Sequence, residues 1–324
     1  MGSSRIYIKF TIRQKKLPNR EVFLIFMIMK FLFSILPEHL RVAFDNLPWD
    51  RVYEIRLRTN QSVVVCISGR SFLLDKTKVT RTDIDTIIHK ASNYSVYSVN
   101  EQIKQGFITI HGGVRIGLCG EVVCENNEIS TVKNISSINI RIPHQIRGCS
   151  YPVLPYVFAE ERPLKTLIIS PPGAGKTTFL RDLAFQVSGK YGLLNTLVLD
   201  ERGEIAASHL GENQLDVGAN TDVITGCTKS YGFENGIRSM RPDVIITDEI
   251  AGRADIEMVQ LAARSGVCIF ASVHAGGIEE IRAKPNFERL IAERVFDRYV
   301  VLGVTDSAGT VMGVYDANLK LLAM

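Results

Sequence analysis

The chain has 324 residues, of which 46% are hydrophobic and 22% charged, and it carries a net charge of +4. This length is generous for one compact domain and sufficient for two, and the composition is that of an ordinary globular protein without low-complexity tracts. The mild basic excess is compatible with an anionic ligand or a membrane surface, but it is far below the dense basic stripe of an obligate nucleic-acid binder.

The cysteine pattern indicates a reducing compartment and no structural metal. The six cysteines form no C-x-x-C pair, and no histidines accompany them at the spacing of a zinc site. Several fall in apolar, strand-like runs, where free cysteine behaves as a small hydrophobic residue. We therefore expect a cytoplasmic protein in which these residues stay reduced: Cys66, Cys119, Cys124, Cys149, Cys227 and Cys268.

The N-terminal region contains an apolar run, Val22–Leu36, which is interrupted only by Lys30 and Ser34. A signal peptide is one interpretation, but no small-residue cleavage site follows, and the run is shorter than the ~20 residues of a membrane-spanning helix. We favour a start at Met29, with residues 1–28 as an upstream extension. A short helix that ends at Pro37 would then follow, and a membrane-surface anchor is the alternative. Its apolar stripe would comprise Phe31, Leu32, Ile35 and Leu36.

Residues 29–150 predict a small α+β domain built mainly from short strands. Alternating apolar and polar side chains at 54–58, 114–118 and 138–142 indicate strands with one buried face. A helix is expected over Asp83–Ala91, with Thr82 as its cap. This region holds no catalytic constellation of its own.

Residues 151–324 change to an alternation of strands and helices. Three prolines between positions 148 and 163 mark the boundary. Short apolar runs then alternate with a helical stripe over Phe179–Val187, which predicts an α/β domain with a parallel-rich sheet flanked by helices. A closing hairpin is expected from 298–305 and 310–315. The apolar runs are Thr166–Ile169, Leu197–Leu199, Val244–Thr247 and Val267–Val273.

The strongest motif runs from Ser170 to Thr178, in the sequence SPPGAGKTT, between a buried strand and a helix. In this context a P-loop binds nucleotide phosphates. Its glycines let the backbone curl so that amides point at phosphate oxygens, and the helix adds its positive end. The motif usually begins with glycine, and we expect a modest effect from Ser170. We expect ATP to be bound by Pro172, Gly173, Ala174, Gly175, Lys176, Thr177 and Thr178.

Two acidic residues later in the chain can complete a site for Mg²⁺ and ATP. Lys176 supplies a charge for the β- and γ-phosphates, while Thr177 and Asp248 are the expected ligands of Mg²⁺. Glu249 is placed to orient or deprotonate the attacking water. A strand that ends in two acids is weak evidence alone, but beside a phosphate loop it becomes strong.

Further candidates for catalysis lie at or near other strand ends. Glu201 and Glu204 could polarise water, although a surface role is as common for each of them. His274 ends an apolar run at the crevice where parallel sheets bind ligands, and it could sense the γ-phosphate. Arg238 could stabilise the charge that develops in phosphoryl transfer. The same reasoning extends to Arg115, Arg141, Arg147, Arg241 and Arg253.

Together these motifs resemble those of the ATPases of type II and type IV secretion systems. Members of that superfamily carry a phosphate loop, an acidic box, a second acidic strand preceded by an arginine segment, and a histidine box, in this order. Here those elements would be 170–178, 200–204, 237–249 and 271–274. More narrowly, the chain is similar to the stage III sporulation protein AA family of endospore-forming bacteria. The supporting stretches are EIRLR at 54–58, HGGVRIG at 111–117, INIRI at 138–142, DERGEI at 200–205 and TDVITGC at 221–227.

The resemblance implies a RecA-like ATPase domain behind an N-terminal domain, assembled as a homo-hexamer. It further implies a motor for a secretion-like channel between mother cell and forespore, with membrane channel proteins as partners and no nucleic acid. A cytoplasmic location, peripheral at the inner face of the mother-cell membrane, follows from the same resemblance.

Other functions stay open on the sequence alone. RecA-like cores also drive nucleic-acid-dependent enzymes, although this chain has no appended basic module or aromatic-rich basic strand. A nucleotide-gated scaffold would bind ATP with little turnover, and it would not need Glu249, Glu204 or His274. A small-molecule kinase is disfavoured because no arginine-rich lid follows the phosphate loop.

Overall fold

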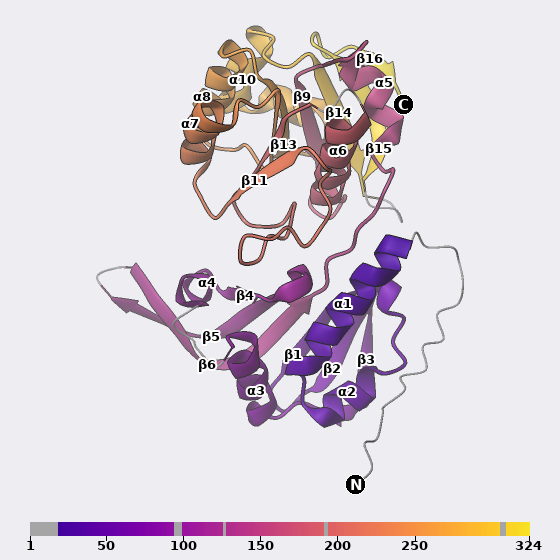
Figure 1. Ribbon diagram of the computed structural model, residues 1–324, viewed down its shortest axis with the longest axis vertical. Helices are drawn as coiled ribbons and strands as arrows, with labels where there is room; N and C mark the ends of the chain where they lie inside the picture. Colours follow the sequence, from indigo (N-terminus) through magenta and orange to yellow (C-terminus); the bar gives the residue numbers. More distant parts are fainter. Residues whose placement is uncertain (1–18, 94–98, 126–127, 191–193, 305–308) are drawn as a thin grey trace.

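The computed structural model describes residues 19–93, 99–125, 128–190, 194–304 and 309–324, and its two main sheets follow one another along the chain (Figure 1). Residues 52–141 supply the first sheet and residues 166–323 the second. Each sheet has its own buried hydrophobic residues, and the division falls between Ile142 and Val153. We refer to these two parts as the N-terminal part and the C-terminal part.

The N-terminal part is an antiparallel sheet of six strands in the order β3-β2-β1-β6-β5-β4, with one face covered by helices. Side chains alternate along each strand, so Leu57 and Ile140 lie on the buried face with Leu32 from the first helix. The elements are α1 (Asn19–Ile35), α2 (Glu38–Phe44), η1 (Trp49–Arg51), β1 (Val52–Arg58), β2 (Ser62–Ile67), β3 (Arg70–Lys78), α3 (Arg81–Ala91), α4 (Asn100–Lys104), β4 (Phe107–Thr109), η3 (His111–Gly113), β5 (Arg115–Glu125) and β6 (Glu128–Arg141).

The C-terminal part is a sheet of eight strands in the order β11-β10-β12-β13-β9-β14-β15-β16. The first six strands in this order are parallel, and the last two are antiparallel. The elements are η4 (Tyr151–Val153), α5 (Leu154–Val157), β7 (Phe158–Ala159), β8 (Arg162–Pro163), β9 (Thr166–Ser170), α6 (Lys176–Lys190), β10 (Thr196–Asp200), β11 (Thr221–Thr225), α7 (Lys229–Met240), β12 (Val244–Thr247), α8 (Arg253–Arg264), β13 (Cys268–His274), α9 (Ile278–Ala283), α10 (Pro285–Ala292), β14 (Arg298–Gly303), β15 (Thr310–Asp316) and β16 (Leu321–Ala323).

Helices cover both faces of the second sheet, which explains why its central strands are apolar throughout. Helices α5 and α6 lie on one side and α7, α8 and α10 on the other (Figure 1). Strand β9 shows the division, because Ile168 packs with the α6 side and Ile169 with the α8 side. The carboxyl ends of β9, β10, β12 and β13 therefore meet at one edge of the sheet, where His274 pairs with Ser170.

The predicted strands of the C-terminal part agree with the structure within one or two residues, but β5 and β6 are much longer than the predicted stretches 114–118 and 138–142, and other local predictions were wrong or incomplete. Helix α1 extends ten residues ahead of Met29, and Ile28 is only 1% exposed in the core. The cap of α3 is Thr80 and not Thr82, because Thr80 and Asp83 form a reciprocal capping box. Strands β3, β4, β7, β8, β11 and β16 were not predicted. The turn expected at 306–309 lies largely outside the described residues.

The apolar N-terminal run lies in helix α1, and one of its faces packs into the N-terminal core through residues such as Leu32 and Ile35. In the part of the chain that the structure describes, no helix combines the length and the hydropathy needed to cross a membrane.

The segment that joins the two parts is fastened to α6 by a buried carboxylate. Asp182 accepts hydrogen bonds from the Gly148 amide at 2.9 Å, the Ser150 amide at 2.8 Å and the Ser150 hydroxyl at 2.6 Å. Its side chain is fully buried, so these donors have no access to water as a substitute.

Replacing Asp182 by alanine is expected to lower the free energy of unfolding by about 3 kcal/mol, because three buried donors lose a charged acceptor. Urea denaturation followed by circular dichroism measures this change. The control is Asp222→Ala on the edge strand β11, where the side chain is exposed and no comparable loss is expected. Equal stability of the two variants would contradict this role of Asp182.

Candidate active site

The phosphate loop connects the buried strand β9 to helix α6 at the carboxyl edge of the second sheet. Gly173 and Gly175 both have φ of +82°, a left-handed conformation that side chains disfavour. An added Cβ at Gly173 would meet no atom within 4 Å, so the loop is open on that side. The first hydrogen bond of the helix runs from the Phe179 amide to the Gly175 carbonyl, and the amides of 176–178 precede it. The loop therefore offers amides and open space to an anion.

Ser170, where the motif usually has glycine, fits the strand end without strain. It is fully buried, its φ is not positive, and its hydroxyl donates to the Pro171 carbonyl at 2.9 Å. Because the backbone here does not need the freedom of glycine, the departure from the motif leaves the shape of the loop intact.

Lys176 lies at the centre of the site and is only 7% exposed. Its ammonium is 2.9 Å from Oδ1 of Asp248 and 3.1 Å from Nε2 of His274. The Thr177 hydroxyl donates to Oδ2 of the same aspartate at 3.4 Å. Four of the residues predicted from the sequence are thus brought into contact from three different strand ends.

The contacts of His274 define its tautomer. An ammonium has no lone pair, so Nε2 accepts from Lys176, and Nδ1 must then carry the proton and donate to the Ser170 carbonyl at 3.3 Å. The imidazole is therefore neutral and bridges the lysine to the end of β9. Any anion that attracts the Lys176 ammonium competes directly with this histidine.

Ser272 is a residue of this site that the sequence reasoning missed. Its hydroxyl donates to Oδ1 of Asp248 at 2.7 Å and accepts from the Glu249 amide at 3.0 Å. Its side chain is fully buried. The signal in the sequence was the period of two along β13, which places Ser272 on the same side as His274.

Glu249 follows Asp248 in an unusual backbone conformation, with φ of +43°. Residues other than glycine are rarely found there, and the strain is held by the hydrogen bond from its amide to Ser272. Its carboxylate lies 3.1 Å from Nη1 of Arg202. The residue predicted to act on water is thus held in an ion pair at the rim of the site.

Asp200 has a structural role at the end of β10. Its carboxylate accepts hydrogen bonds from the amides of Glu204, Ile205 and Ala206 at 2.8–3.1 Å. Burial raises the pKa of this carboxyl, and the amide bonds oppose that rise. Asp200 therefore shapes the loop that follows it.

The structure does not bring Glu201 and Glu204 to the phosphate loop. Glu201 forms an ion pair with Lys229 at 2.6 Å, and Glu204 forms one with Arg115 of the N-terminal part at 2.8 Å. Among the described residues, no hydrogen bond joins either glutamate to the phosphate loop or to Asp248. The sequence could not separate these roles, because Glu201 and Glu204 both lie within four residues of Asp200, the last residue of β10.

Arg238 is also distant from this edge. It is exposed in the last turn of α7, and α7 returns the chain from the carboxyl end of β11 to the amino end of β12. Arg238 therefore lies at the opposite edge of the sheet from the phosphate loop. A catalytic role within one subunit does not fit this position.

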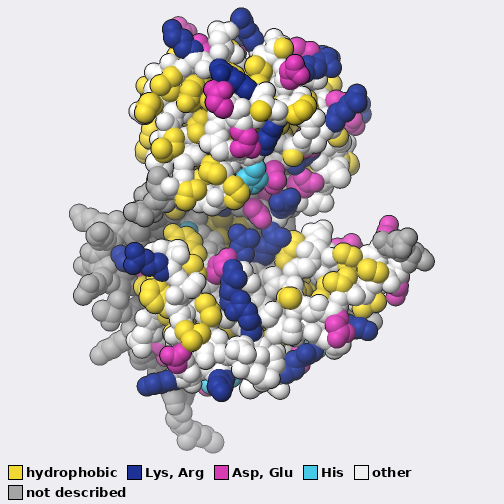
Figure 2. Space-filling view, turned by 180° about the vertical axis from the view of Figure 1, so that it is seen from behind, with side chains coloured by type: hydrophobic (Ala, Val, Ile, Leu, Met, Phe, Trp, Pro, Cys, Tyr) yellow, Lys and Arg dark blue, Asp and Glu magenta, His cyan; other side chains and the backbone are white. Residues whose placement is uncertain are grey.

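Arginines of the N-terminal part gather on one face of the first sheet, and Arg115 among them contacts the C-terminal part through Glu204. The face of the first sheet that no helix covers carries Arg56, Arg58, Arg115 and Arg141. It is the face opposite to the one on which Leu57 and Ile140 are buried. Figure 2 shows Lys and Arg side chains gathered between the two parts, beneath acidic side chains and a histidine of the C-terminal part. Burial lowers the pKa of Arg115, and its ion pair with Glu204 opposes this shift.

Comparisons with known proteins show the family to which this chain belongs. A family model described as sporulation stage III, protein AA, matches residues 29–322. The chain is 38% identical over 296 residues to stage III sporulation protein AA of Bacillus subtilis (strain 168), which covers 90% of this chain and 96% of that protein. The chain belongs to the stage III sporulation protein AA family.

Solved structures show the fold of this family member. The Legionella pneumophila ATPase DotB is similar with a TM-score of 0.56 at 12% identity, over 87% of this chain and 81% of DotB. The pilus retraction motor PilT, solved with bound ADP, is similar with a TM-score of 0.58 at 16% identity, over 88% of this chain and 82% of PilT. The predicted fold class, a P-loop α/β domain with a parallel-rich sheet behind a smaller α+β region, is confirmed.

The side chains present fit a nucleoside triphosphate and Mg²⁺. Open space and free amides at the loop suit phosphate oxygens, and a buried ammonium lies beside them. The Thr177 hydroxyl lies 3.4 Å from the Asp248 carboxylate, so the two groups could bind the same magnesium ion. Such an ion usually keeps water and phosphate oxygens as its other ligands. No group of three or more His, Cys, Asp or Glu side chains that could hold a metal ion occurs in the described ranges.

Replacing Ser272 by alanine is expected to weaken Mg²⁺-dependent nucleotide binding by about 5- to 30-fold, because Asp248 and the Glu249 amide both lose a buried partner. Ser272→Thr keeps the hydroxyl and should restore most of the affinity. Titration with a fluorescent ATP analogue at several Mg²⁺ concentrations measures both variants, and thermal melting checks the fold. Wild-type Mg²⁺ dependence in the alanine variant would show that this hydroxyl does not position the acids.

Proposed function

We propose that this protein is a Mg²⁺-dependent ATPase that powers the assembly or operation of a secretion-like channel during endospore formation. The observation that carries the proposal is the meeting of Lys176, Thr177 and Asp248 within 2.9–3.4 Å at an open phosphate loop. Family membership supports the sporulation role, and the fold shared with DotB and PilT supports an engine.

In this proposal the phosphate loop holds the triphosphate through its amides, and Lys176 leaves Asp248 to bind the β- and γ-phosphates. Thr177 and Asp248 would hold Mg²⁺, which would supply positive charge against the negative charge that develops during phosphoryl transfer. Glu249 would orient and deprotonate the attacking water after its ion pair with Arg202 opens. His274 would lose its contact with Lys176 when the lysine turns to the phosphates, and it would in this way sense the arrival of the γ-phosphate.

The ion pairs around the site suggest that catalysis requires a rearrangement. Asp248, Glu249 and Glu204 are each engaged with a basic side chain in this conformation. A bound triphosphate brings negative charge that competes for the same cations, so nucleotide binding would free the carboxylates. Glu204 would then act indirectly, through its contact with Arg115 in the N-terminal part.

The proposal includes a homo-hexamer located at the inner face of the mother-cell membrane, with channel proteins as partners. Resemblance to secretion ATPases supports this part, and the mass of the particle in solution tests it. Arg238 could reach a nucleotide only across a subunit boundary. Hydrolysis stimulated by single-stranded DNA would instead favour a nucleic-acid-dependent ATPase.

Replacing Lys176 by alanine is expected to abolish measurable ATP binding, because the loop then loses the ammonium that would bind the β- and γ-phosphates. In the described structure, Lys176 is the only lysine that contacts both Asp248 and His274. Isothermal titration calorimetry measures this loss. Lys320→Ala, at an exposed position of the same part, should bind as the wild type does. Unchanged affinity in the Lys176 variant would show that the loop is not the nucleotide site.

Replacing Glu249 by glutamine is expected to lower kcat by about 10²- to 10⁴-fold while nucleotide binding persists, because the amide cannot accept a proton from water. Phosphate release by the purified protein with Mg²⁺ measures turnover, and Glu257→Gln on the exposed face of α8 is the control. If Glu249→Gln kept full turnover, Glu249 would not be the base. If the wild type bound ATP without hydrolysis, the nucleotide-gated scaffold would be the better description.

A further inference from the structure

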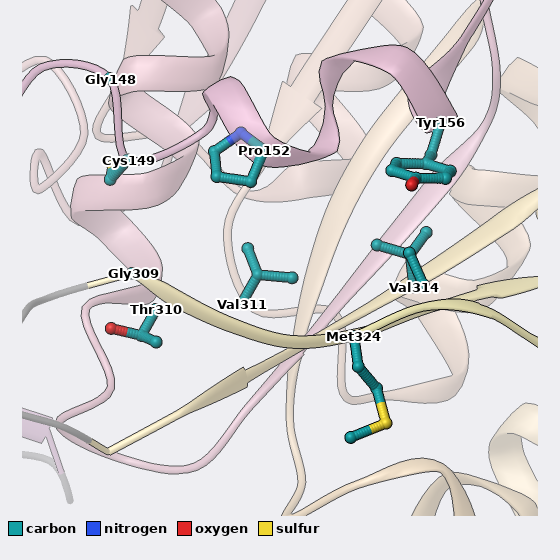
Figure 3. A pocket seen from close by; sticks show the side chains of 10 residues that line it. Gly148, Cys149, Pro152, Tyr156, Gly309, Thr310, Val311, Val314 and Met324 are labelled. Carbon is teal, nitrogen blue, oxygen red and sulfur yellow. The ribbon is translucent and has the colours of Figure 1, made fainter.

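A cavity of about 380 Å³ lies in the C-terminal part, between the joining segment 148–156 and the strands β15 and β16 (Figure 3). Its walls are formed by Pro152 and Tyr156 on one side and by Val311 and Val314 on the other. Figure 3 shows these side chains facing one another across the same space. None of the sequence motifs described above includes this cavity.

The mouth of the cavity adjoins the phosphate loop. The Gly309 amide donates to the carbonyl of Ala174 at 2.8 Å, so the start of β15 is bonded to the loop itself. The Cys149 thiol is 3.9 Å from the carbonyl of Thr178 in the first turn of α6. An added Cβ at Gly309 would lie 3.3 Å from Cys149, so these two segments are in close contact.

The order of strands gives a bound triphosphate a direction. The γ-phosphate end must point toward Asp248 and His274, which end β12 and β13 on one side of β9. The chain of phosphates crosses the loop, so its other end leaves toward the strands on the opposite side of β9. Those strands are β14 and β15, and the cavity opens there.

The lining suits a flat group without charge. Among the described residues, no Lys, Arg, Asp or Glu side chain lines the cavity. Burial raises the pKa of the Cys149 thiol to about 12, so this wall is neutral as well. The ring of Tyr156 and the apolar walls offer stacking and dispersion, which act on any aromatic face. The volume lies within the usual range for small-molecule pockets.

We propose that this cavity binds the base of a purine nucleoside triphosphate, and that it accepts adenine and guanine alike. The inference rests on the proposed function, because it requires the triphosphate to occupy the phosphate loop. A purine presents more ring surface than a pyrimidine to Tyr156 and the valines. The part of the walls that the structure describes carries no charged side chain that would distinguish the polar edge of adenine from that of guanine.

Ala323 and Leu322 on β16 provide a matched pair of positions for a test. Ala323 lines the cavity, whereas Leu322, its neighbour on the strand, does not line it and is 44% exposed. Ala323→Phe therefore fills the cavity, and Leu322→Phe adds the same ring outside it. Val311→Phe fills the cavity from a second strand, in case one substitution disturbs the fold.

Calorimetry with ATP, GTP, CTP and inorganic tripolyphosphate, each with Mg²⁺, measures four dissociation constants for every variant. We expect Ala323→Phe and Val311→Phe to raise the Kd of ATP and GTP by about tenfold or more, and to leave that of tripolyphosphate unchanged. Leu322→Phe should change none of them. In the wild type, ATP and GTP should differ by less than about tenfold, and CTP should bind more weakly.

Each alternative result has a distinct meaning. If the filled variants bind ATP as the wild type does, the base does not occupy the cavity, although the phosphate loop can still be the nucleotide site. If the wild type binds ATP about a hundredfold more tightly than GTP, the acceptance of both purines is overturned. If the wild type binds neither ATP nor tripolyphosphate, the proposed function fails together with this inference.

Discussion

The arrangement of the site depends on one buried ammonium held between a carboxylate and an imidazole. Lys176 begins helix α6, Asp248 follows β12 and His274 ends β13, so three segments far apart in the sequence meet at one charge. Parallel strands make this possible, because their carboxyl ends lie at the same edge. The buried Ser272 then fixes Asp248 and the strained Glu249 relative to each other. The result is a set of cations and acids that neutralise one another until an anion arrives.

The loop 201–220, between β10 and β11, connects this site to the N-terminal part. Asp200 closes the start of the loop onto β10, and Arg181 of α6 donates to the carbonyls of Glu204 and Ile205. Further along, the side chain of Gln145 and the backbone of Asp216 exchange two hydrogen bonds across the boundary. Gly113 shows how close this packing is, because an added Cβ there would lie 2.6 Å from the Cβ of Ala207. The loop 201–220 therefore contacts helix α6, the carboxyl end of β10 and the N-terminal part.

Local patterns predicted most of the fold because each pattern has a direct physical cause. Strands buried on both faces are mainly apolar, as VIIT at 244–247 is, and strands with one open face alternate, as 54–58 does. The edge strand β11 was missed because its side chains are only partly buried and lack both patterns. The cap of α3 was misplaced because two threonines compete there, and only the contact between Thr80 and Asp83 distinguishes them.

The sequence by itself determined the phosphate loop, its strand and helix, the acidic strand end at 248–249 and the family. These features are local or depend on order along the chain, so neighbouring residues are enough to define them. Only the tertiary structure decided which of several acids at strand ends meet the loop. Glu201 directly follows β10 as Asp248 follows β12, and Glu204 is three residues further on, yet Glu201 and Glu204 each pair with a basic residue far away in sequence. Such partners come from the packing of distant segments, and no periodicity within one segment reveals them.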